Sequence, residues 1–397
     1  MMRATVASSS RLIYPTTSMM ERCTCGLIDV AASRRYATAT VEATTRATTK
    51  KARAAKAAKT LTRKSKTLPS HLPQTELFQK CVNLTPINHR PSLINDNSAR
   101  DLVRAWGIDK MHDVTVLECY PGPGGLTRAF LELKNVKKVI AIEEAFRYHP
   151  LLESAKQQLA DPDRLHIVKE EPFLWETYSQ IENDGLLKDV PVKPFDRVHD
   201  NFFLACQMPN HRHGEQLFVQ FLSTTAGRMW LWKLGRFRMG FIGSVPFFNK
   251  ILAPPGSKSH HKLSVLIPAL VNVKVVETMT TLSPPEQHFH KPRHDPAIVE
   301  AVEVVPHVTP LVQDYEVLEF VARNMFVSKS QSWTKGIAAL SAGASNLIPE
   351  MQRRGMPADS TPVKELSLEH WKIISDVYTA WPFKDNIMFD DGQWTME

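Results

Sequence analysis

The chain has 397 residues, of which 43% are hydrophobic and 23% charged, a composition typical of a soluble globular protein with room for more than one domain. No stretch of about 18 residues is free of charge, which excludes a membrane-spanning helix. The five cysteines are too scattered to form a disulfide framework.

The formal net charge of +8 is concentrated at the N-terminus. Residues 1–70 contain 14 Lys and Arg against 3 Asp and Glu, whereas the remainder carries slightly more acidic than basic residues. The folded body is therefore close to neutral. Any nucleic-acid surface on it must be a local patch.

The N-terminus has the composition of a targeting segment. Residues 1–36 are rich in Arg, Ser, Thr and Ala and poor in acidic residues, as in a mitochondrial transit peptide. The pair Arg34-Arg35 ahead of Tyr36 predicts cleavage after Tyr36, and hence a protein of the mitochondrial matrix. A basic tail retained in the mature protein is the alternative.

Residues 37–72 form a basic linker with few large apolar side chains, so we expect this segment to be disordered. Such a segment either holds phosphates by counterion release or is an ordinary solvated linker. We expect an α/β domain over residues 73–305 and a smaller helical domain over residues 306–397.

Short apolar runs alternate with helical patterns from about residue 100, which predicts a parallel sheet covered by helices on both faces. The expected strands, in chain order, are residues 114–119, 138–143, 165–168, 195–208, 236–242 and 262–266. The expected helices of this region are residues 126–133, where Leu126, Phe130, Leu131 and Leu133 form an apolar face, and residues 151–159 and 215–223. Residues 284–294 are expected to be loop, and the pattern after Pro310 is helical.

A proline- and glycine-rich turn follows the first expected strand. It contains Gly122 and Gly124 and precedes a helix, an arrangement that lets backbone N–H groups approach a ligand. Glu143 ends the next strand 21 positions after Gly122, and an acidic residue at that spacing accepts hydrogen bonds from ribose hydroxyls. The combination predicts a nucleotide-type cofactor site. A structural turn with a surface glutamate is the alternative.

The turn and its flanks, VLECYPGPGGLTRAFLE, resemble the first motif of the ribosomal RNA adenine dimethyltransferase family. The similarity covers most of residues 75–350. Within that family the chain is most similar to the mitochondrial transcription factor B branch, especially its fungal members. The supporting stretches are WETY at 175–178, GEQL at 214–217, WLWKLGR at 230–236, and FVSKS at 326–330 with Gly343-Ala344.

The resemblance implies a class I S-adenosylmethionine-dependent methyltransferase (Rossmann-like) α/β fold with a small C-terminal helical domain. It implies S-adenosyl-L-methionine as a cofactor, in use or vestigial. The residues that it assigns to cofactor binding are Glu118, Tyr120, Gly122, Gly124, Glu143 and Glu171, with Glu170 as the alternative to the last. No metal site is expected, because the histidines near residues 211 and 290 lack cysteine or clustered carboxylate partners.

Two departures from the family pattern bear on activity. Tyr120 replaces a glycine that leaves room for the methionine part of the cofactor, so an inward ring would obstruct binding. Gln207, Pro209 and Asn210 fall on the family's catalytic Asn-Leu-Pro-Tyr motif, which positions the adenine amino group and stacks on the base. Phe202 or Phe203 could stack on the base in place of the missing tyrosine. The alternative is that both belong to the hydrophobic core, as apolar strand residues usually do.

These departures favour a binding protein over an enzyme. We expect a mitochondrial transcription initiation factor that binds mitochondrial RNA polymerase and stabilises melted promoter DNA by base stacking and phosphate contacts. The alternatives are an active mitochondrial small-subunit rRNA adenine N6,N6-dimethyltransferase and an assembly factor that only binds this rRNA. The candidate nucleic-acid contacts, each with an alternative as core or solvated surface, are Trp230, Trp232, Lys233, Arg236, Arg238, Lys250, Lys258 and Lys262.

Overall fold

The computed structural model describes residues 68–384, apart from 71, 85, 86, 88, 279 and 291–298. The expected transit peptide, its cleavage after Tyr36 and most of the expected basic linker lie outside the described residues. Within the described part, no helix is both long and apolar enough to cross a membrane.

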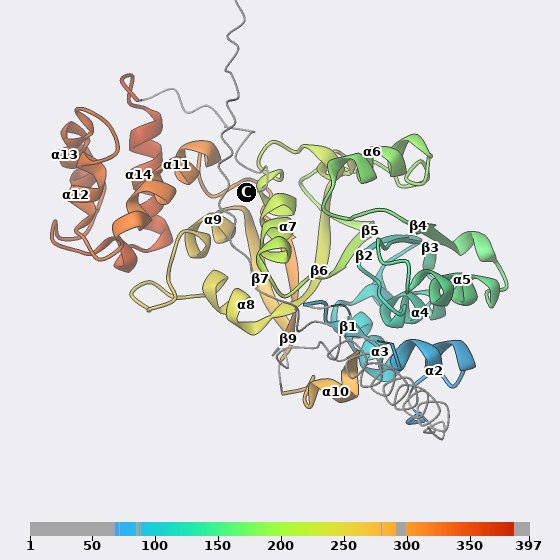
Figure 1. The fold of residues 1–397 in the computed structure, drawn as a ribbon. Coiled ribbons are helices and arrows are strands. Elements are labelled where there is room, and N and C mark those ends of the chain that lie inside the picture. Colours follow the sequence, from blue (N-terminus) through green and yellow to red (C-terminus); the bar gives the residue numbers. More distant parts are fainter. Residues whose placement is uncertain are drawn as a thin grey trace, which may run out of the picture. The chain divides into compact units, whose positions relative to one another are not determined.

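A seven-stranded sheet forms the centre of the described chain, in the order β4-β3-β2-β5-β6-β9-β7 (Figure 1). The parallel strands are β2 (Val114–Cys119), β3 (Val136–Ile142), β4 (Leu165–Val168), β5 (Val198–Gln207) and β6 (Arg236–Ser244). The other two strands are β9 (Val299–Pro306), antiparallel to β6, and β7 (Val271–Glu277), which pairs with β9 at the edge. The strand order reverses between β2 and β5, and ligands of open α/β sheets bind at the carboxyl edge of such a point.

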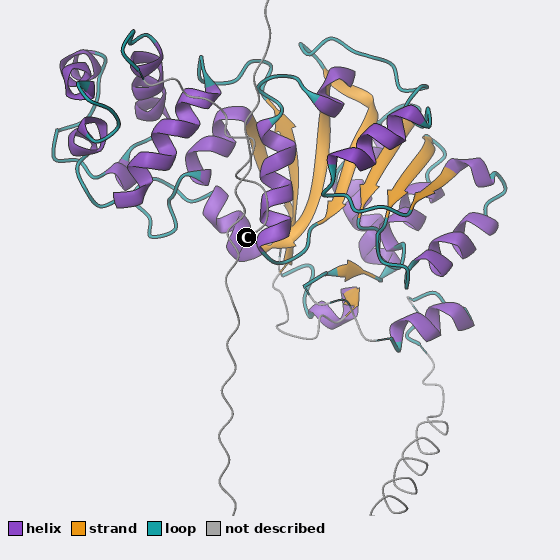
Figure 2. Cartoon of the chain, turned by 45° about the horizontal axis from the view of Figure 1, so that its top comes forward, coloured by secondary structure: helices purple, strands orange, loops and turns teal. Residues whose placement is uncertain are grey.

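Helices cover both faces of the sheet (Figure 2). The helices are α3 (Asp96–Ala105), α4 (Gly125–Glu132) and α5 (His149–Gln157) on one face, and α6 (Trp175–Asn183) and α7 (Arg212–Ser223) on the other. Successive side chains of β2 point to opposite faces of the sheet. Val116 packs in the core beneath α3 and α4, and Leu117 packs in the core beneath α6 and α7. Burial on both faces explains why β2 is apolar along most of its length.

A group of helices follows the sheet. The connecting helices are α8 (Val245–Ile251) and α9 (Leu263–Leu270), and the C-terminal group is α11 (Tyr315–Met325), α12 (Trp333–Ala338), α13 (Ile348–Arg353) and α14 (Leu368–Thr379). Both α11 and α14 contact α9, and the rings of Phe326 and Trp371 stack 5.1 Å apart within the group. The domain boundary at residue 306 remains a prediction.

Further short elements lie outside the seven-stranded sheet. They are α2 (Glu76–Val82), β1 (Ser92–Leu93), α10 (Pro285–His288) and β8 (Phe289–His290), and β1 pairs antiparallel with β8. Residues 284–294, expected to be loop, therefore contain a helical turn and a short strand up to His290. Residues 291–294 lie outside the described part.

The expected strand at 262–266 is wrong, because this segment begins helix α9. Nearly every residue of LSVLIPAL is buried, so the sequence shows no polar face whose period could distinguish a helix from a strand. Within the seven-stranded sheet, two strands, β7 and β9, were not expected. Both lie at the antiparallel edge, where Val and Glu or Lys alternate with partial exposure.

Candidate cofactor and nucleic-acid sites

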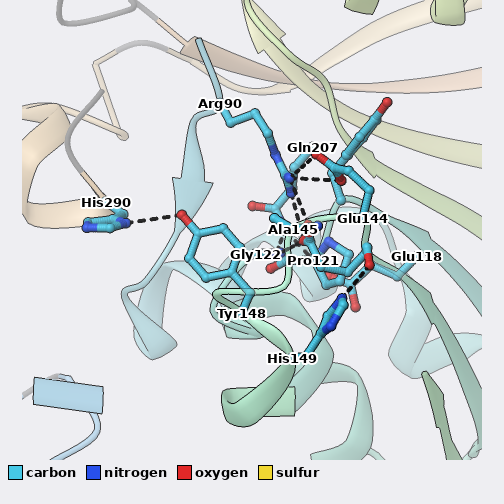
Figure 3. A network of polar contacts seen from close by, with 12 residues as sticks. Arg90, Glu118, Pro121, Gly122, Glu144, Ala145, Tyr148, His149, Gln207 and His290 are labelled. Carbon is cyan, nitrogen blue, oxygen red and sulfur yellow. Dashed lines mark hydrogen bonds and ion pairs between the residues drawn. The ribbon is translucent and has the colours of Figure 1, made fainter. Parts of the chain in front are cut away.

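The residues that the sequence assigns to cofactor binding meet at the carboxyl edge of the sheet, and Figure 3 shows Glu118 and Gly122 among them. Glu118 lies at the end of β2, Glu143 directly follows β3, and Glu171 follows β4. The Gly122 N–H donates to Glu143 Oε2 at 2.8 Å, and the Tyr120 hydroxyl donates to Glu171 Oε1. We call this constellation the adenosyl site.

The backbone at Tyr120 has the conformation of a glycine. Its φ of 57° lies in the left-handed region, like those of Gly122 (59°) and Gly124 (81°) in the same turn. This conformation costs a residue with a Cβ about 1–2 kcal/mol. The strain explains the glycine in the family motif. In this chain, contacts of the tyrosine side chain with Glu171 and Arg90 must offset it.

The ring of Tyr120 points inward and crosses the adenosyl site. Only 1% of the residue is exposed, and its hydroxyl contacts Glu171 with His213 Nε2 at 3.5 Å. Burial and the neighbouring carboxylate raise the pKa of Tyr120 above its usual value. Burial alone would raise the pKa of Glu171, but hydrogen bonds from His213 and Tyr120 lower it. Glu170, the alternative acid, is exposed.

Arg90 occupies both oxygens of Glu143. Its Nη1 lies 2.8 Å from Glu143 Oε1 and its Nη2 lies 2.7 Å from Oε2, in a two-pronged ion pair of side chains that are 4% and 0% exposed. The same guanidinium contacts Glu144 at 2.8 Å and lies 4.7 Å from the centre of the Tyr120 ring. The Ala145 N–H also donates to Glu143, at 2.9 Å. Glu143 is therefore fully satisfied within the protein.

The arrangement does not fit S-adenosylmethionine. The acid at the position of Glu143 accepts hydrogen bonds from ribose hydroxyls in nucleotide-binding folds of this type. Here that carboxylate is paired with Arg90, the Tyr120 ring covers the space beside it, and Glu171 holds the tyrosine hydroxyl. The sequence could predict the obstruction by Tyr120, but no motif pointed to Arg90, which lies 53 residues before Glu143.

Gln207 also turns into the protein. Its Oε1 accepts from the Leu93 N–H at 2.8 Å, and its Nε2 donates to the Pro121 carbonyl at 3.2 Å and approaches Glu118 Oε1 at 3.5 Å. Burial raises the pKa of Glu118 to about 8, against the lowering effect of a hydrogen bond from Thr127. The amide of Gln207 is thus committed to internal contacts.

Asn210 provides no stacking surface. Its backbone N–H donates to the His89 carbonyl at 2.5 Å, and both atoms of its side-chain amide are buried without a partner among the described residues. The suggestion that a phenylalanine replaces the lost ring is wrong, because Phe202 and Phe203 are both fully buried. Phe202 packs edge-on against Phe237 within the core, since it belongs to a central strand with covered faces.

Trp232, which the sequence analysis predicts to contact nucleic acid, lies in the core. Its ring is 1% exposed and stacks 4.0 Å from Phe237, and its Nε1 donates to the Phe221 carbonyl at 3.0 Å. Trp230 is half-buried and stacks on Phe221 at 5.0 Å. These tryptophans close the core beneath α6 and α7.

Most of the other candidate cations are engaged within the fold. Arg238 pairs with Glu303 at 2.7 Å, and Lys250 pairs with Glu215 at 3.1 Å. Arg236 donates to the Phe195 and Pro306 carbonyls at 3.0 and 3.1 Å, and exposed Lys233 pairs with Glu182. These contacts assign Arg236 and Arg238 mainly to holding strand β6 against its neighbours.

Lys258 and Lys262 differ from that group. Both are exposed, on the loop between α8 and α9, and neither forms an ion pair with any described residue. Lys329 joins them, because its Nζ donates to the Lys258 and His260 carbonyls at 2.8 and 3.0 Å. We call Lys258, Lys262 and Lys329 the basic surface.

An exposed apolar patch was not expected from the sequence. Leu174 is 47% exposed, Trp175 42% and Met229 59%, and the Trp175 ring lies 5.3 Å from that of Trp230. We call Leu174, Trp175 and Met229 the aromatic patch. Its signal in the sequence was weak, since a tryptophan at the start of an amphipathic helix usually belongs to the core.

The antiparallel strand β9 is inserted between β6 and the edge strand β7. This strand order defines a class I methyltransferase-type α/β fold, which confirms the predicted fold class. The family model described as "Ribosomal RNA adenine dimethylase" matches residues 92–379, so the chain belongs to the ribosomal RNA adenine dimethylase family.

Named relatives fall into two groups. The chain is 25% identical over 297 residues to mitochondrial transcription factor 1 of Lachancea kluyveri, covering 71% of this chain and 85% of that protein. It is 26% identical over 290 residues to mitochondrial dimethyladenosine transferase 1 of Homo sapiens, covering 69% and 75%. A solved dimethyladenosine transferase from Plasmodium falciparum aligns with a TM-score of 0.48 and 14% identity, covering 71% of this chain and 95% of that one. The predicted similarity to the fungal transcription factors is confirmed.

Proposed function

We propose that this protein is a transcription initiation factor of the mitochondrial matrix, which binds mitochondrial RNA polymerase and stabilises melted promoter DNA. The observation that carries the proposal is the loss of the acceptor motif. Gln207 is bonded to Leu93 and Pro121 inside the protein, and Asn210 has no ring to hold an adenine. The similarity to proteins named mitochondrial transcription factor 1 supports the assignment.

The described surface offers the groups that unpaired DNA requires. Single strands bind to cations that follow the phosphates and to aromatic faces on which bases stack. The basic surface supplies exposed lysines at Lys258 and Lys262, and the aromatic patch supplies the exposed ring of Trp175. We assign the phosphate contacts to the former and base contacts to the latter.

The decisive experiment is transcription from a purified system. The chain without its expected transit segment, residues 1–36, is added to the mitochondrial RNA polymerase of the same organism. The templates are a duplex promoter and the same promoter with a mismatched start region. A melting factor stimulates the duplex template strongly and the mismatched template weakly. Equal stimulation of both, or none on either, contradicts the proposal.

Charge-reversal variants test the surface. Lys258→Glu with Lys262→Glu should reduce transcripts from the duplex promoter several-fold, because like charges then face the phosphates. Lys134→Glu with Lys188→Glu is the matched control, since these lysines are also exposed but lie away from the basic surface. Equal loss in the two variants would point to net charge rather than to this surface.

An active rRNA dimethyltransferase is the second candidate, because the chain belongs to that family and keeps Gly122, Gly124 and Glu143, but it requires Arg90 and Tyr120 to leave the adenosyl site. Labelled methyl transfer from S-adenosylmethionine to a small-subunit rRNA hairpin tests it, with Glu143→Ala as the inactive control. Binding of the hairpin without methyl transfer would instead indicate an rRNA assembly factor. Transcription and methylation assays on the same preparation separate these activities.

A further inference from the structure

A short strap lies along the adenosyl site. It consists of residues His89–Leu93, and it contacts Tyr120, Gln207 and Asn210, the positions at which the chain departs from its family, together with the acid Glu143. The His89 carbonyl accepts from the Asn210 N–H, and Arg90 pairs with Glu143. The Leu93 N–H donates to the Gln207 side chain. Figure 3 shows Arg90 reaching from this strap into the polar network.

The strap also uses the space that the glycines leave. A Cβ added to Gly122 would lie 2.7 Å from Ser92 Oγ, and one added to Gly125 would lie 2.4 Å from the Leu93 carbonyl oxygen. Both distances are far below van der Waals contact. The close approach to the turn is therefore made by the chain itself.

The side chains of Arg90 and Tyr120 reproduce the interactions of an adenosyl ligand. The guanidinium presents two donors to the Glu143 carboxylate, as a pair of ribose hydroxyls would. Tyr120 places an aromatic ring beside that cation, and its hydroxyl donates to Glu171 as an adenine amino group would. The two acids thus have donors without any bound molecule.

We propose that Arg90 and Tyr120 form a two-part internal occupant of the adenosyl site, and that both must be removed before it accepts an adenosine-type ligand with free vicinal hydroxyls. Either side chain alone is sufficient to exclude the ligand. Removal of Tyr120 leaves Glu143 paired, and removal of Arg90 leaves the ring across the site. The proposal concerns the free protein and does not depend on its role in transcription.

Calorimetric titration with S-adenosylmethionine and S-adenosylhomocysteine tests this directly. Wild type, Arg90→Ala and Tyr120→Gly should show no saturable binding up to about 1 mM, and the double variant should bind with Kd of about 100 µM or tighter. Arg100→Ala, which removes a surface guanidinium paired with Glu132, is the matched control and should gain nothing. Saturable binding by wild type, or a folded double variant that binds neither ligand, overturns the proposal.

A second variant and a second measurement guard against misfolding. Arg90→Lys with Tyr120→Gly keeps a cation but not the two-pronged contact, and it should bind about 10-fold more weakly than the double variant. Hydrogen exchange at the Gly122 and Ala145 amides, both donors to Glu143, should be slow in ligand-free wild type and at least about 10-fold faster in Arg90→Ala. Unchanged exchange in that variant would show that Arg90 does not hold Glu143, which also overturns the proposal.

Discussion

The adenosyl site and the basic surface treat their charged groups in opposite ways. In the adenosyl site Glu143 is buried and has partners for both oxygens, from Arg90, Gly122 and Ala145. On the basic surface Lys258 and Lys262 are exposed and form no ion pair with a described residue. Unsatisfied groups are the ones available to a ligand. In the proposed function, recognition therefore lies at the loop beside the C-terminal helices and not at the carboxyl edge of the sheet.

The largest effect should come from breaking the buried pair. Arg90→Met leaves the Glu143 carboxylate buried with its cation removed, so we expect the free energy of unfolding to fall by about 3–5 kcal/mol. Urea denaturation measures the loss. Lys258→Met should change it by less than about 0.5 kcal/mol, because this side chain is exposed. Similar losses in the two variants would remove the contrast between the two regions.

Two tryptophans extend the contrast to aromatic side chains. Trp232→Ala empties a fully buried site and should cost about 3–5 kcal/mol of stability, whereas Trp175→Ala should cost about 1 kcal/mol. In the transcription assay, at a temperature where both variants are folded, Trp175→Ala should give fewer transcripts from the duplex promoter than Trp232→Ala. A greater transcription defect in folded Trp232→Ala would argue against the aromatic patch.

The burial of Glu118 predicts a pH dependence. Its pKa is raised to about 8 in the folded protein from an ordinary 4.5, so the folded state holds a proton that the unfolded state lacks between these values. Stability contributed by this group therefore falls as pH rises through that window, by up to about 1.4 kcal/mol per unit. Glu118→Gln should remove this slope. Parallel denaturation curves of variant and wild type at pH values across the window would show that Glu118 is ionised in the fold.

The smallest expected effect is on the salt dependence of binding to single-stranded DNA. Removal of one phosphate-binding cation reduces the slope of log affinity against log salt by about 0.7 for single strands. Lys258→Gln should therefore lower the slope for a single-stranded oligonucleotide by about that amount, and Lys134→Gln should leave it unchanged. Fluorescence anisotropy at several salt concentrations measures both. An unchanged slope in Lys258→Gln would exclude this lysine from the phosphate path.

Local spacing carried the successful predictions. Strand β2, the turn with Gly122 and the acid at Glu143 lie within a short stretch, and their order alone predicted that they would meet. The resemblance to the family's first motif marked Tyr120 as an obstruction if its ring pointed inward, and the ring does point inward. Such features depend on neighbours in the chain, which a sequence displays directly.

Features set by tertiary packing could not be predicted in this way. Nothing near Arg90 indicated its partner Glu143, because the two meet only when the strap lies against the sheet. Trp232 and Trp175 have similar aromatic and charged neighbours in the sequence, yet one is in the core and the other is exposed. The helix at 263–270 had no polar face to reveal its period. In each case the sequence does not show which helix, strand or loop packs against the residue in the fold.

The positive φ at Tyr120 restricts what can replace it. A β-branched residue such as valine would bear the same backbone strain without a hydroxyl for Glu171 or a ring for Arg90. Glycine would relieve the strain but leave a hole. Position 120 therefore tolerates glycine or tyrosine and few residues of intermediate size. We expect evolutionary change at this position to be a direct replacement of one by the other.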